Sequence, residues 1–348
     1  MKIITVKASS TYDIMIDRGI LNNCGALIKQ NTGAKKLAVV TDSVVNEIYA
    51  DTVMQSLERE GFEAVKFVFP NGEASKSAGV LNDIYEFLAL NNITRTDCLV
   101  ALGGGVVGDI TGYAAATYLR GVEFVQIPTT LLAQIDSSVG GKTAINLPCG
   151  KNLVGAFKQP DCVICDIDTL KTLSPEILSD GMAEAIKYGM IKDKELFDII
   201  GSHTIDNVSE VIDEIIYRSV LIKRDIVEAD EFDRGERMLL NFGHTLGHAV
   251  ESYYKYSRYT HGSAVALGMY AFTERLNGKG DLLDSLESCL KAYNLPTEIE
   301  VGVDKLVPLC YNDKKRESDK INIVLCKEKG KAYTEKLSIA EFNAFMGV

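Results

Sequence analysis

The sequence lacks the features of an exported, membrane-bound or disulfide-stabilised protein. No apolar stretch reaches the roughly 20 residues that a helix needs to span a bilayer, and no signal-peptide pattern precedes the strand-like run MKIITVKA. The eight cysteines are scattered along 348 residues, without the density of a disulfide scaffold. We therefore expect a soluble protein of the cytoplasm.

The sequence also has fewer basic than acidic residues. Lysine and arginine total 37 against 48 aspartates and glutamates, which gives a net charge of -11. This charge disfavours nucleic acid and anionic membranes as partners, although it is compatible with a local cluster of cations. We therefore expect a small-molecule ligand and neither a nucleic-acid nor a membrane partner.

Short apolar runs alternate with helical patterns in the first half of the chain. Residues 44–60 and 74–91 have helical spacing. Five runs have the length and β-branched content of buried strands: KKLAVVTD, EAVKFVFP, DCLVALGGG, EFVQIPTT and DCVICDID. The alternation predicts an α/β domain with a mainly parallel sheet. Cys162 and Cys165 form a C-x-x-C in the last run, and a buried strand explains it better than zinc because no second cysteine pair completes a ligand set.

The second half of the chain has a different character. Ser174 and Pro175 suit a helix start with proline at its first position, and helical spacing continues to about residue 293. The run KINIVLCKEKGKAYTEKLS then predicts a β-hairpin that turns around Gly330. We expect an N-terminal α/β domain over residues 1–172 and a mainly α-helical C-terminal domain over residues 173–348.

Histidine is rare, and three of the four histidines fall between Asn241 and His261. His244 and His248 are four residues apart, so they project from one face of a helix, and neutral imidazole is the commonest metal ligand. Arg237 and Asn241 precede them at one-turn spacing, which predicts a polar column along one helix face. A metal or proton-transfer site is favoured over hydrogen-bonded core histidines. The H-E-x-x-H pattern of zinc peptidases is absent from this run.

The glycine run GGGVVGD lies between a predicted strand and a predicted helix and satisfies G-x-G-x-x-G through Gly103, Gly105 and Gly108. Glycines let the backbone approach a pyrophosphate, and a helix N-terminus offers free N–H groups. We interpret the run as a nucleotide-binding turn rather than an ordinary strand-to-helix connection. Asp42 is the better candidate for a ribose contact because it ends its strand, whereas Glu123 begins one.

A further group of polar residues accompanies spaced lysines. Glu184 and Lys187 lie one helical turn apart in AEAIKYG, and LIKRD supplies Lys223. The glycine-rich segment DSSVGGKTAINLPCGKN has no helical or strand period, so it predicts a loop that carries Asp136, Lys142, Lys151 and Asn152. Such a loop suits a phosphate. Solvated helix surface explains most other lysines of the chain, but the neighbouring glycine and histidine motifs favour an anion site for this set.

These motifs together resemble the 3-dehydroquinate synthase family, within the wider sugar-phosphate cyclase and iron-alcohol-dehydrogenase-like group. The resemblance spans almost the whole chain and rests on several blocks: PNGEASK, GGGVVGD, IPTTLLAQIDSSVGGKTAIN, GKNLVGAF, GMAEAIKYG, NFGHTLGHAVE and HGSAVALGM. It implies a homodimer with two cofactors, NAD and a divalent metal, for which zinc is expected and cobalt can substitute.

The resemblance also assigns roles to residues. It implies that Glu184, His244 and His261 bind the metal and that His248 is catalytic, whereas spacing alone suggests that both His244 and His248 are ligands. The residues implied at the NAD site are Asp42, Asn71, Glu73, Lys76, Gly104, Gly105, Val106, Asp109, Thr129, Thr130, Lys142, Lys151, Thr169 and Thr172. The residues implied at the substrate are Lys142, Asn152 and Asn241 for its phosphate and Lys223 and Arg237 for its carboxylate, with Asp136 and Lys187 also catalytic. Lys314 or Lys315 is expected to close over the substrate, and Arg120 to reach the phosphate in the partner subunit.

The implied reaction is that of a carbon–oxygen lyase, which converts 3-deoxy-D-arabino-heptulosonate 7-phosphate to 3-dehydroquinate and phosphate in the shikimate pathway of aromatic amino acid biosynthesis. NAD oxidises the C5 hydroxyl, which makes the C6 proton removable and permits β-elimination of phosphate. The hydride then returns to C5, the ring opens, and an intramolecular aldol step closes the carbocycle. Zinc lowers the pKa of a bound oxygen, and His248 is the expected proton acceptor.

The residues alone leave other functions possible. A metal-dependent polyol dehydrogenase needs the nucleotide and metal residues, but it releases NADH and needs no set of anion-binding residues. A non-catalytic nucleotide-binding or regulatory module has little use for a metal site beside a separate His248. Related cyclases that form inosose or valiolone products share the chemistry. Lys223 and Arg237 favour a substrate with a carboxylate, because a neutral sugar phosphate would leave them unpaired.

Overall fold

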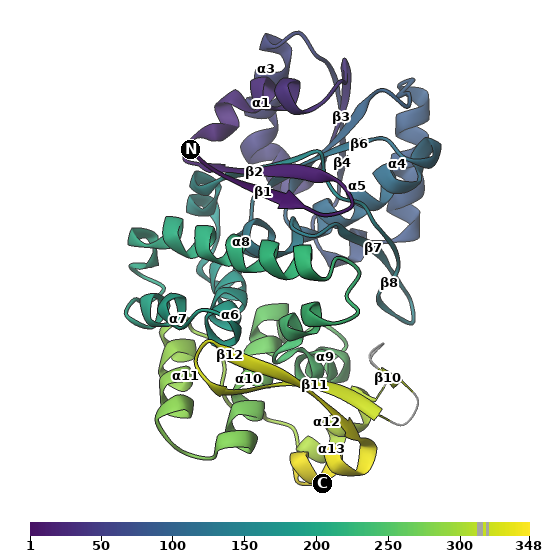
Figure 1. Cartoon of the computed structure of the whole chain (residues 1–348). Coiled ribbons are helices and arrows are strands. Elements are labelled where there is room, and N and C mark those ends of the chain that lie inside the picture. Colours follow the sequence, from purple (N-terminus) through teal and green to yellow (C-terminus); the bar gives the residue numbers. More distant parts are fainter. Residues whose placement is uncertain (312–315, 318–319) are drawn as a thin grey trace. The chain divides into compact units, whose positions relative to one another are not determined.

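The computed structural model describes residues 1–311, 316–317 and 320–348, and its elements are drawn in Figure 1. The chain divides into two compact units. Unit 1 consists of Met1–Leu173 and Lys223–Phe232, and unit 2 of Ser174–Ile222 and Asp233–Val348. The sequence predicts one boundary after Thr172, and the structure differs from it because a later segment groups with unit 1.

Hydrogen bonds explain why Lys223–Phe232 groups with unit 1. The Lys7 backbone N–H donates to Glu228 at 2.7 Å, and the Ser9 N–H donates to Glu231 at 2.8 Å. The division between the units therefore falls within helix α8 (Ile212–Ala229). A helical period carries no information on such a division, so sequence alone could not place it.

Unit 1 is built around a seven-stranded sheet with the order β1-β2-β9-β6-β5-β3-β4. Its strands are β1 (Lys2–Lys7), β2 (Thr11–Asp17), β3 (Lys36–Asp42), β4 (Glu63–Phe69), β5 (Cys98–Gly103), β6 (Glu123–Pro128) and β9 (Cys162–Asp166). Its helices include α1 (Cys24–Asn31), α2 (Ser43–Val45), α3 (Asp51–Arg59), α4 (Ala78–Leu90) and α5 (Gly105–Thr117). Only β1 and β2 pair antiparallel in this sheet, so the predicted mainly parallel α/β fold is confirmed.

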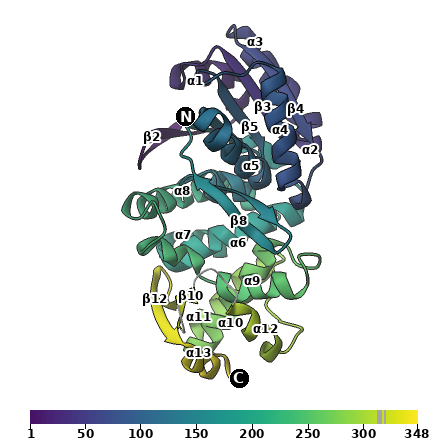
Figure 2. The same ribbon diagram turned by 90° about the vertical axis from the view of Figure 1, so that its right-hand side faces the viewer.

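The two faces of the sheet are buried by different helices. Alternate strand residues such as Val39 and Val100 pack with α1 and α3, whereas their neighbours Val40 and Ala101 pack with α4 and α5. Figure 2 shows α4 and α5 over the second face. Strands buried on both faces are continuous apolar runs, which is why they were visible in the sequence. Cys162 and Cys165 lie in β9 as buried free thiols, which confirms the strand prediction for the C-x-x-C.

The predicted loop around Lys142 is wrong, because the chain forms the antiparallel hairpin β7 (Lys142–Leu147) and β8 (Gly150–Phe157) there. No residue of β8 is buried, so the strand has no apolar alternation that would reveal it. The two strands of the hairpin approach closely at Gly155, where a Cβ would lie 2.1 Å from the Thr143 carbonyl oxygen. Close pairing of these strands thus requires glycine at this position.

Unit 2 is mainly helical, as predicted. Its helices are α6 (Pro175–Ile191), α7 (Lys194–Gly201), the first part of α8, α9 (His244–Tyr253), α10 (His261–Asn277), α11 (Asp281–Ala292), α12 (Val303–Cys310) and α13 (Ile339–Met346). Ser174 caps α6 by accepting a hydrogen bond from the Ile177 N–H, so the predicted Ser-Pro helix start is confirmed. No helix in the described part of the chain has both the length and the apolar content to cross a membrane.

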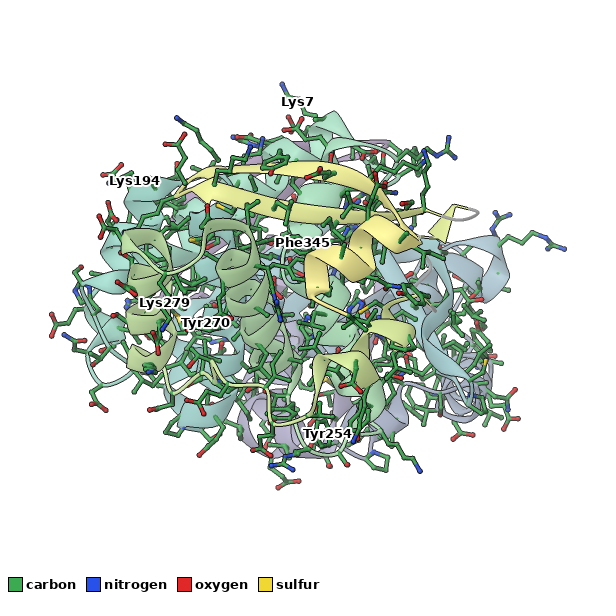
Figure 3. All side chains as sticks on the ribbon, turned by 90° about the horizontal axis from the view of Figure 1, so that it is seen from below. Lys7, Lys194, Tyr254, Tyr270, Lys279 and Phe345 are labelled. Carbon is green, nitrogen blue, oxygen red and sulfur yellow. The ribbon has the colours of Figure 1, made fainter. Side chains whose placement is uncertain are left out.

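The C-terminal part of unit 2 contains the predicted hairpin. β11 (Lys320–Glu328) pairs antiparallel with β12 (Lys331–Ser338) around Gly330, and β10 (Arg316–Glu317) pairs with β11. The helix that follows packs on α10 through an edge-on contact between Phe345 and Phe272, whose rings are 5.6 Å apart. Figure 3 shows Phe345 on α13.

Close packing of α9 on α10 depends on glycine, which leads to a first prediction. A Cβ on Gly268 of α10 would lie 1.9 Å from the carbonyl oxygen of Gly243, which precedes α9. Because backbone cannot move aside as a side chain can, we expect Gly268→Ala to lower the free energy of unfolding by about 1–3 kcal/mol. Urea unfolding measures this change. Gly201→Ala is the control, since nothing lies within 4 Å of its Cβ position, and an equal loss in both variants would contradict the prediction.

Candidate active-site residues

Three helices of unit 2 bring a carboxylate and two imidazoles together. Glu184 lies on α6, His244 begins α9 and His261 begins α10. The Nε2 atoms of His244 and His261 lie 3.5 and 3.4 Å from the same Glu184 oxygen, Oε1. One ligand atom from each residue lies within 4.8 Å of the other two. The structure therefore gathers the three residues that the resemblance implies as metal ligands.

The electrostatics of this cluster suit a cation. Burial alone would raise the pKa of Glu184, but the Lys187 ammonium and the His261 imidazole outweigh it and lower the pKa to about 2. Burial alone would lower the pKa of His261, but Glu184 and Glu251 outweigh it and raise that pKa to about 10. Two buried carboxylates thus make the cluster strongly attractive to positive charge.

The carboxylate of Glu184 and the two imidazoles form a donor set that suits a divalent metal ion. Glu184 is 1% exposed, and among the described residues neither of its carboxylate oxygens accepts a hydrogen bond of ordinary geometry. Lys187, 2% exposed, forms an ion pair with it from the next turn of α6. A buried carboxylate that faces two imidazole nitrogens is the mixed N/O set that zinc and cobalt bind.

His248 lies beside the cluster rather than within it. Its ring centroid is 5.4 Å from that of His244 and 6.2 Å from that of His261. It shares a second group of possible ligands with Glu251 and His261. Sequence reasoning missed Glu251, although an acid one turn after His248 on the same helix face was a usable signal.

The predicted polar column along one helix is wrong. Arg237 and Asn241 lie in a separate 3-10 helix, Glu236–Asn241, which ends before α9 begins. Phe242 has an extended ψ of 126° and Gly243 a φ of 78°, so the helix cannot continue into His244. A spacing of four residues in a 3-10 helix does not place two side chains on one face. Arg237 is nevertheless buried, with 2% exposure, as an anion-binding residue would be.

The residues implied at the NAD site lie in unit 1, and most of them are at or after the carboxyl ends of parallel strands. Asp42 ends β3, Gly104 and Gly105 follow β5, and Thr129 follows β6. Register pairs Thr41 with Leu102 and Gly103 with Pro128, so these ends are level. β4 lies on one side of β3 and β5 on the other, which makes the gap between β3 and β5 a topological switch point. Open α/β sheets bind ligands at such points.

Three further residues of this set follow other strands at the same edge. Asn71, after β4, donates its N–H to Ser43 at 3.1 Å, so the ends of β3 and β4 are joined. Thr169 and Thr172 follow β9, and the Tyr49 hydroxyl contacts the Thr169 carbonyl oxygen at 3.0 Å and the Thr172 hydroxyl at 2.7 Å. The residues that begin or line α5 and its preceding turn are Gly104, Gly105, Val106, Asp109 and Thr130.

Lys76 connects this edge to the β7–β8 hairpin. Its ammonium forms an ion pair with Asp109 and donates to Asn152 Oδ1 at 2.5 Å. Burial raises the pKa of Asp109, although Lys76 opposes the shift. Asn146, which sequence reasoning missed, donates to Glu73 at 2.7 Å. Residues implied for NAD and for the substrate phosphate thus share one hydrogen-bonded network.

Lys223 is paired with Asp136. Its buried ammonium donates to the Asp136 carbonyl at 2.6 Å and to its carboxylate at 2.7 Å. Lys142 and Lys151 lie on the hairpin strands, and Arg120 lies in the turn after α5 with a φ of 69°. The two lysines expected to close over the substrate, Lys314 and Lys315, lie outside the described residues.

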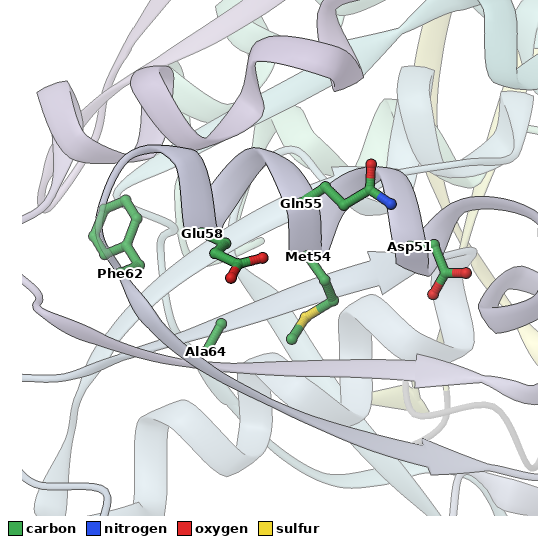
Figure 4. Close-up of a pocket in the computed structure, with 6 residues that line it drawn as sticks. All are labelled: Asp51, Met54, Gln55, Glu58, Phe62 and Ala64. Atoms are coloured by element: carbon green, nitrogen blue, oxygen red, sulfur yellow. The ribbon is translucent and has the colours of Figure 1, made fainter.

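A surface pocket of ≈ 310 Å³ lies elsewhere in unit 1, on α3 and β4 (Figure 4). It is lined by Asp51, Met54, Gln55, Glu58, Phe62 and Ala64. None of these residues belongs to the predicted sites. Its two carboxylates are unsuited to a phosphorylated ligand, so this pocket is not a candidate for the substrate.

Comparison with known proteins first places the fold. A 2-deoxy-scyllo-inosose synthase, solved with carbaglucose-6-phosphate, NAD+ and Co2+, is 22% identical with a TM-score of 0.87 and a coverage of 99% of each chain. The 2-epi-5-epi-valiolone synthase of Streptomyces hygroscopicus subsp. jinggangensis 5008, solved with NAD+ and Zn2+, is 24% identical with a TM-score of 0.87 and covers 99% of this chain and 98% of its own. The chain therefore has the fold of these synthases.

Sequence comparison then gives the family. The model of the 3-dehydroquinate synthase N-terminal domain matches residues 66–180, and that of the C-terminal domain matches residues 181–316. The 3-dehydroquinate synthase of Streptococcus suis (strain 05ZYH33) is 43% identical over 355 residues, with 100% of both chains covered. The chain belongs to the 3-dehydroquinate synthase family.

Proposed function

We propose that this chain converts 3-deoxy-D-arabino-heptulosonate 7-phosphate to 3-dehydroquinate and phosphate, in the shikimate pathway. The full-length 43% identity to a 3-dehydroquinate synthase carries this proposal. The gathered Glu184, His244 and His261 support it, since they come from three separate helices. The reaction class is that of a carbon–oxygen lyase that eliminates phosphate and closes a ring.

Two cofactors complete the proposal, NAD and a divalent metal. NAD supplies a reversible hydride acceptor, and the metal supplies a Lewis acid that lowers the pKa of a substrate hydroxyl. Glu184, His244 and His261 would hold the metal, with zinc expected and cobalt as a substitute. Asp42, the turn at Gly104 and Gly105 and the residues after the neighbouring strands would hold NAD.

The other residues act on the substrate directly. His248 accepts the proton of the C5 hydroxyl, which its place beside the cluster allows. Lys142, Asn152 and Asn241 bind the phosphate. Since Asp136 already neutralises much of the charge on Lys223, Arg237 is the main partner of the substrate carboxylate. A bidentate guanidinium–carboxylate pair fixes the orientation as well as the position of the substrate.

A direct assay tests this function. Purified protein is incubated with the heptulosonate phosphate, zinc and substoichiometric NAD, and the product is identified by NMR while released phosphate is counted. We expect one phosphate per 3-dehydroquinate and no accumulation of NADH, because the hydride returns to the carbon it left. NADH that rises in step with product would point instead to a polyol dehydrogenase.

We further propose a homodimer, as the family resemblance implies, and a location in the cytoplasm, as the lack of a signal-peptide pattern and of a membrane-spanning run suggests. Arg120 lies in a turn of unit 1 with a left-handed φ of 69° and would act in the partner subunit. Sedimentation equilibrium of the full chain tests the dimer. Mixing Arg120→Ala chains with chains of an inactive second variant tests whether Arg120 acts in the partner's site, since mixed dimers would then recover activity.

Asp42 gives a prediction specific to the cofactor. Its Oδ1 caps α2 by accepting from the Val44 and Val45 N–H groups at 2.9 and 3.0 Å, and its second oxygen would bond the ribose. Asp42→Asn keeps an oxygen for the cap but replaces the charged acceptor, so we expect NAD affinity to fall by about tenfold or more with little loss of stability. Calorimetric titration with NAD measures this. Asp51→Asn on α3 is the control, and unchanged NAD affinity in Asp42→Asn would refute the assignment.

A further inference from the structure

We propose that Glu251 is a positioning residue, which orients His261 so that its Nε2 atom faces the metal. The inference rests on the metal site of the proposed function. Glu251 lies on α9, two turns after His244, and it is 4% exposed. Its Oε2 atom lies 3.5 Å from His261 Nδ1, while Nε2 on the other side of the same ring lies 3.4 Å from Glu184.

Both imidazoles of the cluster present the Nε2 atom to Glu184. His244 also turns its Nε2 toward Glu184, and its Nδ1 lies 3.1 Å from the Phe242 carbonyl oxygen. A neutral imidazole carries one proton, and an acceptor beside Nδ1 fixes that proton there and leaves the Nε2 lone pair for a metal. Glu251 gives His261 the acceptor that a backbone carbonyl gives His244.

The hydrogen bonds around the His261 backbone do not orient its imidazole ring, so a side-chain acceptor is needed for the ring. It is the first residue of α10, where the preceding Thr260 caps the helix through Ser263 and the Gly262 N–H donates to Asp180 at 2.5 Å. These bonds fix where the Cα of His261 lies, but they leave the rotation of its ring open. Glu251 supplies the contact to the ring itself.

Burial of a carboxylate also requires an explanation. A buried charge is destabilising unless it is paired, so Glu251 would be a poor choice for packing alone. A second metal bound by His248, Glu251 and His261 is the competing explanation, since their ligand atoms also lie within 4.8 Å of one another. That site would use His261 Nδ1 while Nε2 binds the first metal, and an imidazole bound at both nitrogens must lose its last proton. One ion per chain is therefore expected.

The experiment compares metal binding in four proteins, the wild type, Glu251→Gln, Glu251→Leu and the control Ser252→Ala, whose exposed side chain is next along α9. Co2+ affinity is measured by competition with a chelator, its stoichiometry by metal analysis, and the metal-free unfolding temperature by calorimetry. We expect Glu251→Gln to bind Co2+ about tenfold more weakly and Glu251→Leu up to about 100-fold more weakly. Ser252→Ala and the unfolding temperature of metal-free Glu251→Gln should match the wild type.

A spectroscopic measurement separates orientation from simple stability. The chain has four histidines, so ¹H–¹⁵N spectra of the imidazoles in the zinc-loaded protein can be assigned by single substitutions. We expect His261 to carry its proton on Nδ1 in the wild type and in Glu251→Gln, whose amide oxygen still accepts. In Glu251→Leu we expect that signal to shift or broaden.

The outcomes separate this inference from the function on which it rests. Unchanged Co2+ affinity in Glu251→Gln and Glu251→Leu, or two ions per wild-type chain, would overturn the role of Glu251 and leave the function intact. A wild type that binds no metal would overturn the proposed function itself. If Glu251→Leu does not fold, the Gln variant alone decides, since it keeps the volume and one acceptor oxygen.

Discussion

His244→Ala is expected to lose the metal and the activity together, whereas His248→Ala is expected to lose activity and keep the metal. The reason is geometric. His244 Nε2 lies 3.5 Å from Glu184 Oε1, within the cluster that fits a divalent ion, and its loss leaves only Glu184 and His261 as protein donors. A structural or catalytic zinc site usually has three or four protein ligands, so two bind too weakly to retain the ion through dialysis.

Metal analysis after dialysis, together with phosphate release, measures both effects. We expect the metal content of His244→Ala to fall to near zero and that of His248→Ala to stay near one ion per chain. His203→Ala is the control, because this histidine contacts the Ile199 carbonyl at 2.8 Å on α7 and lies outside both candidate metal groups. Equal metal loss in His244→Ala and His248→Ala would contradict the assignment of His244 as a metal ligand and His248 as a catalytic residue.

The α/β fold was predictable because its strands are buried on both faces. β3, β5 and β9 are continuous apolar runs, and each ends at a turn residue that the sequence shows. The hairpin of β7 and β8 was not predictable in the same way, since its exposed positions obey no apolar alternation. Strand pairing there is determined by contacts with the rest of unit 1, which local pattern does not record.

The site was predictable only in part. The spacing of His244 and His248 indicated a metal but suggested a different pair of ligands from the one that the resemblance implies, because a one-turn spacing says which face two residues share and not where each ring points. Glu184 came from the resemblance, since a buried carboxylate in α6 has no local signature. The break at Gly243, which separates Arg237 from the α9 face, follows from a positive φ that the sequence leaves open for any glycine.

Arg237→Met is expected to lower kcat/KM for the heptulosonate phosphate by about a hundredfold or more. Arg237 is 2% exposed, so it is desolvated before substrate arrives, and a charged hydrogen bond there is roughly twice as strong as a neutral one. Methionine matches the aliphatic part of the arginine side chain but has no guanidinium group, which leaves the substrate carboxylate without its partner. Lys223 can replace it only in part, because Asp136 already accepts two of the three hydrogen bonds that its ammonium can donate.

Specific controls decide whether Arg237 recognises the acid or merely stabilises the fold. Arg234→Met removes the same charge from an exposed position three residues earlier and should retain wild-type kcat/KM. Arg237→Lys keeps the charge but loses the planar fork, so its loss should be intermediate. Metal content and NAD affinity should be unchanged in Arg237→Met, since neither uses that side chain. If the wild type converts sedoheptulose 7-phosphate or glucose 6-phosphate as efficiently as the acid, Arg237 does not select a carboxylate, and the chemistry is that of another sugar-phosphate cyclase.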